Sequence, residues 1–211
     1  MKKGLVHLYI GDGKGKTTAA VGLALRAVGQ NILVAMVQFM KGGRYTGELL
    51  AAERFLGGRL KIKQFGRGCI REEKQLTVAS FEEKGLPKGG LLVRNDEPCG
   101  ECRYCFVNDE TQKRFCEDAY AYAKKILEAG DHGMVVLDEL VYAVTYGMLP
   151  LEKGLELISL KKDFVELIIT GGAWKGKVPG EFLERADLVT EMRKVKHYYE
   201  QGVPARRGVE Y

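Results

Sequence analysis

The sequence predicts an α/β protein with a doubly wound, mainly parallel sheet, and three observations support this class. Short apolar runs alternate with amphipathic helical segments along most of the chain. The runs at residues 31–40 and 134–137 are almost continuously apolar, as expected of parallel strands that helices cover on both faces. A glycine-rich turn joins the first apolar run to the first helical segment.

The predicted elements follow from hydrophobic period and from glycine and proline punctuation. Strands are expected at residues 5–10, 31–40, 60–65, 134–139, 165–170 and 188–192. Helices are expected at residues 17–28, 48–56, 111–129, 150–161 and 179–185. The 211 residues are expected to form a single domain, with an irregular cysteine-containing insertion at about 86–116 and a C-terminal flap at 193–211.

Composition excludes several classes of partner. The net charge of +5, from 33 basic and 28 acidic residues, suits an anionic ligand, and without a long basic run it does not indicate nucleic acid. No apolar run approaches the roughly 20 residues that span a bilayer, so no membrane contact is expected. Residues 1–4 lead directly into the first strand and do not resemble a signal peptide, which favours the cytoplasm.

The segment from Gly11 to Thr18, between the first strand and the first helix, is typical of a phosphate-binding loop. Its glycines allow successive backbone N–H groups to face one anion, and the helix N-terminus adds a positive field. Lys16 can neutralise phosphate charge, and the Thr17 hydroxyl can join the ligands of Mg²⁺ or Mn²⁺. The alternative is a glycine turn before a helix with exposed lysines. The predicted fold is therefore P-loop NTPase-like.

The loop is one residue shorter than usual. Four residues normally separate the first glycine from Gly-Lys, whereas three separate Gly11 from Gly15, and Ile10 stands at the usual first position. We therefore expect the loop to hold a polyphosphate differently from an ordinary ATPase loop.

Two carboxylates, Asp138 and Glu139, end the apolar strand that starts at Met134. An acidic residue at this point of a phosphate-binding protein reaches the metal or its water shell. The alternative is that the acid only caps the next helix. Together with Lys16 and Thr17, the pair predicts a magnesium site.

The polar tail from Lys194 to Tyr211 is either a frayed end or a flap over a ligand. Its His197, taken alone, is more often structural than a metal ligand. Together with the glycine loop at Gly11 to Thr18, however, the tail matches the sequence pattern of a known protein family.

The chain resembles the ATP:corrinoid adenosyltransferases. The resemblance rests on Gly11 to Ala20, Val37 to Gly42, Val135 to Leu140, Ile168 to Gly171, Val195-Lys196-His197 and Gly208 to Tyr211. It is collinear outside residues 70–115. It implies that cobalt(I) of a reduced corrinoid attacks C5′ of ATP and that triphosphate leaves, with ATP held in a reversed sense on the short loop.

By matched position, the resemblance implies roles for particular residues. ATP binding falls to Gly11, Asp12, Gly13, Lys14, Gly15, Lys16, Thr17, Thr18 and Arg26, the last as a buttress of the phosphates. Catalytic roles fall to Lys16, Thr17 and Glu139, and the metal ligands are Thr17, Asp138 and Glu139. The corrinoid side is assigned to Lys41, Cys69, Arg71, Lys196 and His197. The family also suggests a homodimer.

The chain departs from the family at three positions. Asp12 stands where asparagine is common, and Cys69 and Arg71 stand where some members place aromatic residues that drive off the corrinoid's axial ligand. Displacement of that ligand here would need other groups, so the preferred corrinoid is not predicted.

Four closely spaced cysteines, Cys99, Cys102, Cys105 and Cys116, lie outside the family pattern. Their spacing indicates a [4Fe-4S] cluster or structural Zn²⁺, with free thiols or a disulfide as alternatives. A cluster could relay an electron from a donor protein to cobalt(II), whereas Zn²⁺ would only stabilise the insertion.

Two other functions remain open from the sequence. One is a P-loop ATPase or small-molecule kinase. The other is a non-catalytic nucleotide- or metal-sensing module, which the residues at Cys69 and Arg71 and the extra cysteines suggest.

Overall fold

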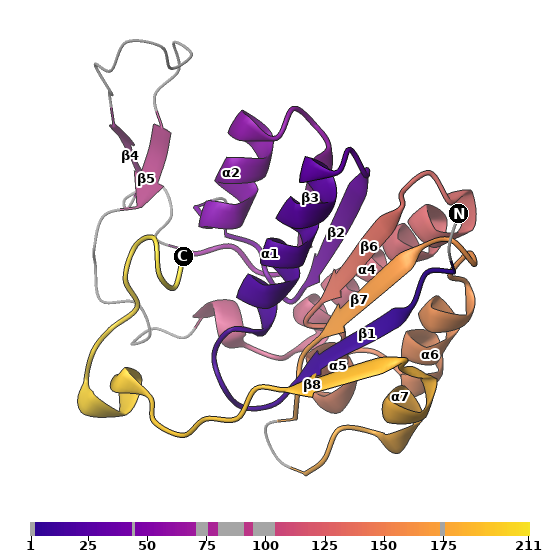
Figure 1. The fold of residues 1–211 in the computed structure, drawn as a ribbon. Helices are drawn as coiled ribbons and strands as arrows, with labels where there is room; N and C mark the ends of the chain where they lie inside the picture. The colour runs from indigo at the N-terminus through magenta and orange to yellow at the C-terminus, as the bar shows by residue number, and fades with distance from the viewer. Residues whose placement is uncertain (1–2, 44, 71–75, 80–90, 95–103, 174–175) are drawn as a thin grey trace.

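The predicted α/β class is confirmed by a computed structural model, which describes residues 3–43, 45–70, 76–79, 91–94, 104–173 and 176–211. A parallel sheet of six strands has the order β3-β2-β6-β7-β1-β8 (Figure 1). Its strands are β1 (Val6–Ile10), β2 (Val34–Phe39), β3 (Leu60–Phe65), β6 (Met134–Asp138), β7 (Glu166–Thr170) and β8 (Leu188–Glu191). A separate antiparallel pair joins β4 (Leu76–Ala79) to β5 (Leu91–Arg94).

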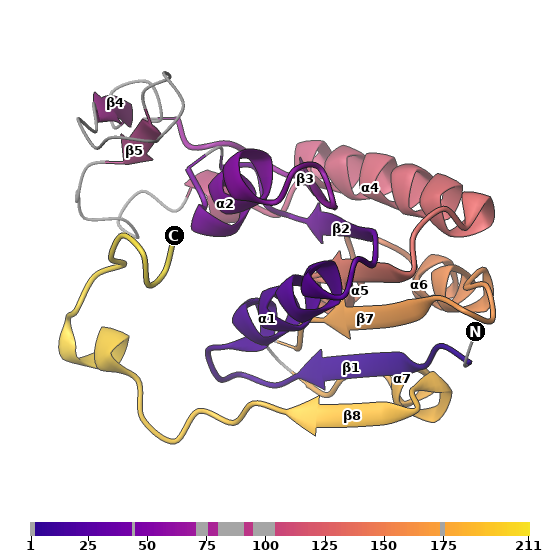
Figure 2. The ribbon, with the colours of Figure 1, turned by 45° about the horizontal axis from the view of Figure 1, so that its top comes forward.

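Helices cover both faces of the large sheet. The α-helices are α1 (Lys16–Gly29), α2 (Gly47–Phe55), α4 (Glu110–Ala129), α5 (Leu140–Thr145), α6 (Leu151–Ser159) and α7 (Gly180–Arg185). Two short 3₁₀ helices are η1 (Tyr104–Phe106) and η2 (Tyr198–Gln201). Figure 2 shows the helices on either side of the sheet, with the chain after β8 running separately to the C-terminus.

Each face has its own apolar core. Ala20, Ala24 and Ala27 of α1 pack with Ala52 of α2 on one face, and these small side chains let the helices approach the strands closely. On the other face, α4 presents Cys116, Ala119, Ala123 and Leu127, whose spacing of three and four residues follows one side of a helix. The strands between these layers are therefore buried on both faces, which explains their continuously apolar sequences.

Strand register brings polar side chains to one edge of the sheet. All six strands are parallel, so their carboxyl ends share that edge, where ligands bind in open α/β sheets. Gln38 of β2 is aligned with Asp138 of β6, and Thr170 of β7 is aligned with Tyr9 of β1. Strand β7 lies between β1 and β6, which separates the glycine loop from Asp138 by a single strand.

The sequence analysis did not predict helix α5. Its six residues, Leu140 to Thr145, are apolar except for Tyr142 and Thr145, so they have no amphipathic period to distinguish a helix from a continued strand. Leu140, Val141 and Ala143 are fully buried. The β4–β5 pair was not predicted either, and β5 falls in the insertion at about 86–116 that was expected to be irregular. In the part of the chain that the structure describes, no helix has the length and apolar character that crossing a bilayer requires.

Truncation of a core residue should destabilise the fold strongly. Leu127 is fully buried on α4, so Leu127→Ala should lower the free energy of unfolding by roughly 2–5 kcal/mol. Leu25 on α1 is 54% exposed, and Leu25→Ala should change it by less than about 0.5 kcal/mol. Urea denaturation of both variants measures the difference, and equal effects would contradict the assigned core.

Candidate active site

The loop between β1 and α1 packs tightly against the chain that leaves β8. Gly11 and Gly15 have φ values of 114° and 119°, which favour glycine. A Cβ at Gly11 or Gly13 would lie 2.4 or 2.6 Å from the Met192 carbonyl oxygen. The Gly13 N–H group donates to that same oxygen at 2.7 Å. The backbone after β8 therefore holds the loop at the positive end of α1.

Lys16, the first residue of α1, folds its side chain back onto this loop. Its Nζ donates to the carbonyl oxygens of Gly11 and Gly13, both at 2.8 Å, and lies 5.7 Å from the centre of the Tyr142 ring. The residue is only 8% exposed, and this burial lowers the pKa of its ammonium. A triphosphate would give the ammonium charged acceptors, which bind it more strongly than neutral carbonyls do.

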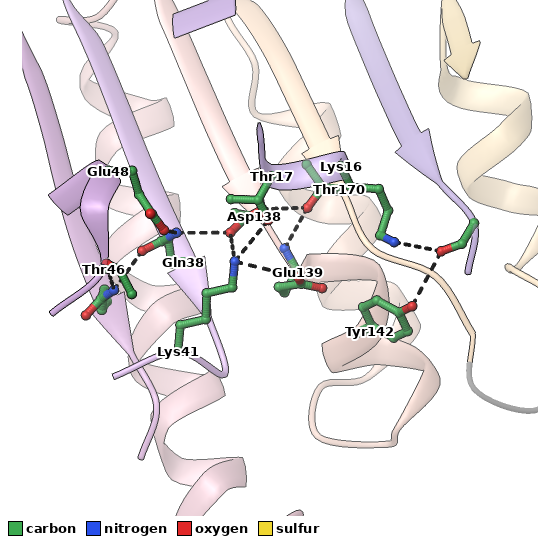
Figure 3. A network of polar contacts seen from close by, with 12 residues as sticks. Lys16, Thr17, Gln38, Lys41, Thr46, Glu48, Asp138, Glu139, Tyr142 and Thr170 are labelled. Atoms are coloured by element: carbon green, nitrogen blue, oxygen red, sulfur yellow. Dashed lines mark hydrogen bonds and ion pairs between the residues drawn. The ribbon is translucent and has the colours of Figure 1, made fainter. Parts of the chain in front are cut away.

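Asp138, at the end of β6, is the centre of a buried hydrogen-bond network (Figure 3). Its Oδ1 accepts from the hydroxyls of Thr17 at 2.9 Å and Thr170 at 2.7 Å. Its Oδ2 accepts from the ammonium of Lys41 at 2.7 Å and the amide of Gln38 at 3.1 Å. Burial alone would raise the pKa of Asp138, but the attraction of Lys41 and these hydrogen bonds hold it below its ordinary value.

Gln38 connects Asp138 to the neighbouring strands. Its Nε2 also donates to Glu48 Oε1 at 3.1 Å, and its Oε1 accepts from Gln64 Nε2 at 2.9 Å. Gln64 in turn donates to Thr46 Oγ1 at 3.1 Å. Because Gln38 is fully buried, this chain of amides fixes the orientation of the Asp138 carboxylate from behind.

Glu139 has a strained backbone next to Asp138. Its φ of 64° lies in the left-handed region, and its N–H group donates to Thr170 Oγ1 at 3.0 Å. Its Oε1 lies 3.7 Å from Lys41 Nζ, and its side chain is 20% exposed. Burial, together with the Asp138 charge, raises the pKa of Glu139. The pKa values of these two adjacent carboxyl groups are thus shifted in opposite directions, because the donors around Asp138 stabilise its charged form.

Lys41, which the sequence analysis assigned to the corrinoid side, contacts Thr17 and the two carboxylates at the end of β6. Its ammonium donates to Thr17 Oγ1 at 3.0 Å as well as to Asp138. Burial opposes the charge, but the carboxylates of Asp138 and Glu139 raise the pKa of Lys41 above its ordinary value. Lys41 therefore belongs to the carboxylate cluster, and its assignment to the corrinoid side stays a prediction.

Two tyrosines, one in α5 and one at its C-cap, form an aromatic surface beside the loop. The rings of Tyr142 and Tyr146 stack with centres 5.5 Å apart and an angle of 14° between their planes. The Tyr142 hydroxyl donates to the Gly11 carbonyl oxygen at 3.4 Å. Burial, with a contribution from Glu139, raises the pKa of Tyr142 to about 12, so its hydroxyl stays protonated.

The tail leaves β8 beside the glycine loop. Asp12 Oδ1 accepts a hydrogen bond from the Lys194 N–H group at 3.0 Å. Further along, His197 Nδ1 accepts from the Tyr199 N–H group at 3.1 Å and so begins helix η2, while Lys196 is exposed. In this arrangement His197 has a structural contact, which is the alternative that the sequence favoured for this residue taken alone.

The end of the tail returns to the loop. Lys14 Nζ donates to the Val209 carbonyl oxygen at 2.9 Å and lies 3.6 Å from Glu210 Oε1. The rings of Tyr211 and Tyr45 meet edge to face, with centres 5.6 Å apart. The tail therefore passes from the end of β8 to the loop after β2, as Figures 1 and 2 show.

The structure brings most of the expected ATP and metal residues together but excludes Arg26. Lys16, Thr17, Asp138 and Glu139 lie at one edge of the sheet. Arg26 lies in the last turn of α1, roughly 15 Å along the helix axis from Lys16, and it is exposed. It therefore cannot buttress phosphates at the loop, and that prediction was wrong.

The cysteine cluster is only partly described. Cys99, Cys102 and Arg71 lie outside the described residues, whereas Cys105 lies in η1 and Cys69 in the loop after β3. Cys116 is fully buried on α4, and burial raises the pKa of its thiol to about 12. The Cys116 side chain packs in the apolar core beneath α4, and its place as the fourth metal ligand stays a prediction. Within the described ranges, no three histidine, cysteine or acidic side chains gather as a metal site.

Of the side chains that donate directly to Asp138, two were missed as site residues. Gln38 is polar within the otherwise apolar run of β2, and Thr170 ends β7 just before a glycine pair. A buried polar residue inside a strand was the available signal, since such groups need partners.

These features define an α/β protein with a P-loop NTPase-like fold. A parallel sheet ends in a glycine loop, a lysine and a threonine at a helix N-terminus, and a buried acid.

The chain belongs to the ATP:corrinoid adenosyltransferase family. It matches the family described as ATP:corrinoid adenosyltransferase BtuR/CobO/CobP over residues 2–89 and 92–211. The corrinoid adenosyltransferase of Escherichia coli (strain K12) is 32% identical over 210 residues, which cover 100% of this chain and 87% of that protein. The corrinoid adenosyltransferase of Pseudomonas aeruginosa is 31% identical over 212 residues, which cover 100% of this chain and 85% of that protein.

Glu210 anchors the tail by accepting hydrogen bonds from Tyr198 and Arg206, and acid should weaken this anchor. Partial burial opposes the charge, but hydrogen bonds from Tyr198 and Arg206 lower the pKa of Glu210 from 4.5 to about 2. A lowered folded-state pKa stabilises the tail fully above about pH 4.5, and this stabilisation is lost as pH falls toward 2. Hydrogen-exchange protection of residues 198–211 should therefore decline across that range.

Substitution of the anchor tests this dependence. Glu210→Gln should lower the protection of the tail already at pH 7, whereas Glu184→Gln, at an exposed position of α7, should not. Unchanged protection in Glu210→Gln would contradict the anchoring role.

Proposed function

We propose that this protein transfers the 5′-deoxyadenosyl group of ATP to the cobalt(I) of a reduced corrinoid and releases triphosphate. The observation that carries the proposal is the family match over nearly the whole chain, which includes the shortened glycine loop and the tail. The two curated relatives described above bear the name corrinoid adenosyltransferase, in agreement with this reaction.

The reaction balances as a two-electron displacement. The cobalt(I) electron pair forms the Co–C bond with C5′ while the C5′–O bond breaks, and that bonding pair leaves with triphosphate. Cobalt becomes formally cobalt(III). Because the leaving group carries several negative charges, the protein mainly has to position C5′ and stabilise the triphosphate.

The glycine loop has the groups that a triphosphate requires. Gly15 precedes α1 and has no side chain that could cap the helix, so the first N–H groups of α1 face the loop. Lys16 exchanges its two carbonyl acceptors for phosphate oxygens, and this exchange neutralises charge as the bond breaks. Lys14 and Asp12 connect the same loop to the tail.

The oxygen atoms beside the loop fit a divalent cation. The hydroxyl of Thr17 and the carboxylates of Asp138 and Glu139 converge on the ammonium of Lys41, which shows that they favour a positive charge. Mg²⁺ and Mn²⁺ prefer such hard oxygen ligands. When bound there, the ion would neutralise part of the charge on the departing triphosphate.

The corrinoid is assigned to the side of the site that the tail faces. This part of the proposal includes Lys196 and His197 of the tail, together with Cys69 and Arg71 after β3. The stacked rings of Tyr142 and Tyr146 add an apolar surface close to the loop, suited to a flat ligand.

We further propose that Cys99, Cys102 and Cys105, with Cys116 as the fourth ligand, bind a metal, as a [4Fe-4S] cluster or as Zn²⁺. The support is their sequence spacing. A cluster would carry an electron from a donor protein to cobalt(II) before the transfer. The proposal also includes a homodimer in the cytoplasm, as the family resemblance and the composition suggest.

Removal of Lys16 tests the nucleotide site. Lys16→Ala should reduce adenosyl transfer roughly 100-fold or more, because it deletes the cation that stabilises the leaving group. The assay mixes protein, ATP, Mg²⁺ and chemically reduced cobalamin and follows the spectrum of the Co–C product together with triphosphate release.

The exposed Lys61, at the start of β3 and away from the loop, provides the matched control. Lys61→Ala should keep wild-type turnover, and circular dichroism should show that both variants are folded. Near-normal turnover in Lys16→Ala would exclude this loop as the ATP site. If the wild type forms ADP and phosphate without corrinoid, it is an ATPase or kinase, and binding without turnover would indicate a sensing module.

Metal analysis of anaerobically purified protein tests the cysteine proposal. An iron–sulfur cluster should give iron, sulfide and broad absorption near about 400 nm. Cys105→Ser and Cys116→Ser should each lose the metal, because each removes one of the four proposed thiolate ligands. Stoichiometric zinc without colour would exclude the electron relay, and absence of any metal would contradict the site.

A further inference from the structure

The ammonium of Lys41 lies among the oxygen atoms proposed as ligands of the divalent ion. Its Nζ is 3.0 Å from Thr17 Oγ1, 2.7 Å from Asp138 Oδ2 and 3.7 Å from Glu139 Oε1 (Figure 3). These oxygens come from the start of α1 and the end of β6. The chain thus supplies its own cation to the set of oxygens formed by Thr17, Asp138 and Glu139.

The Asp138 carboxylate has its acceptor positions occupied. A carboxylate offers about four lone-pair directions, and the side chains of Thr17, Thr170, Gln38 and Lys41 donate to them. A metal ion can reach Asp138 only where a donor withdraws. Thr170 and Gln38 are fully buried, whereas the Lys41 side chain is 28% exposed and extends from a loop. Lys41 is therefore the donor best able to leave.

The backbone around Lys41 fixes where its side chain begins. Met40 has a φ of 58°, and a Cβ on Gly66 would lie 2.4 Å from the Lys41 backbone nitrogen. A Cβ on Gly42 would lie 2.2 Å from the Gly66 carbonyl oxygen, so the loops after β2 and β3 are in tight contact. Withdrawal of the ammonium is therefore a rotation of the side chain about a fixed backbone.

We propose that Lys41 is the resident cation of this oxygen set and that a divalent ion binds there by displacing its ammonium. The proposal rests on the assignment of Thr17, Asp138 and Glu139 to the divalent ion. In the enzyme without nucleotide, the ammonium compensates a buried carboxylate that would otherwise be unpaired. Triphosphate offers the displaced ammonium a new anionic partner, so the metal binds best together with ATP.

Direct metal binding tests the displacement. Free Mn²⁺ is measured by electron paramagnetic resonance during titration of the protein without nucleotide. If the ammonium occupies the set for more than about nine-tenths of the time, Lys41→Met should bind Mn²⁺ at least roughly tenfold more tightly than the wild type. ATP should then increase Mn²⁺ affinity less in Lys41→Met than in the wild type, because the competing cation is already gone.

Matched variants separate displacement from a general change of charge. Lys16→Met removes the same charge from the neighbouring loop, and Lys61→Met removes it from an exposed position of β3, yet both leave Lys41 in place. Neither should tighten Mn²⁺ binding by more than about threefold. Lys41→Gln keeps a hydrogen-bond donor for Asp138 and should behave like Lys41→Met, which covers the case in which the methionine variant fails to fold.

The outcomes are distinct from those of the transfer assay. Unchanged or weaker Mn²⁺ binding in both Lys41 variants would overturn the proposal, as would equal tightening in Lys16→Met. The proposed function fails separately, when wild-type protein forms no Co–C product from ATP and reduced corrinoid. A tightened Mn²⁺ site with no such product would leave the displacement supported and the reaction wrong.

Discussion

The buried carboxylate of Asp138 determines how the rest of the site is built. An ionised carboxylate without water is tolerated only when donors surround it, and here β2, β7, α1 and the loop after β2 each provide one. These elements are distant in sequence, and the parallel sheet brings their carboxyl ends to one edge. The ionisation of Asp138 therefore depends on the fold, since the acid stays charged only while these elements remain in place.

Much of the fold was predictable because its signals are local. The apolar runs, the glycine loop and the period of α4 each depend on residues close in sequence, and the elements observed there agree with the expected ranges. Helix α5 could not be predicted in this way. Tertiary burial stabilises it on nearly all sides, and an apolar segment of six residues does not reveal which regular structure it adopts.

The site was predicted less completely, because its contacts are distant in sequence. A motif places Lys16 and Thr17 at a helix N-terminus, but nothing local indicates that Lys41 turns toward Asp138. The phosphate-binding role predicted for Arg26 was wrong because a residue's position along a helix determines which groups its side chain can contact. Arg26 lies at the far end of α1 and cannot contact the loop. Cys116 was grouped with the other cysteines by spacing, whereas the period of α4 directs it into the core.

The contact between the glycine loop and the Met192 carbonyl has a consequence for how this protein can diverge. The backbone of residue 192, and not its side chain, meets Gly11 and Gly13. Replacement of Met192 by another residue would leave this contact intact, whereas a side chain at either glycine would push the two segments apart. Descendants of this chain can thus vary the side chain at position 192 while the backbone that leaves β8 stays fixed beside the glycine loop.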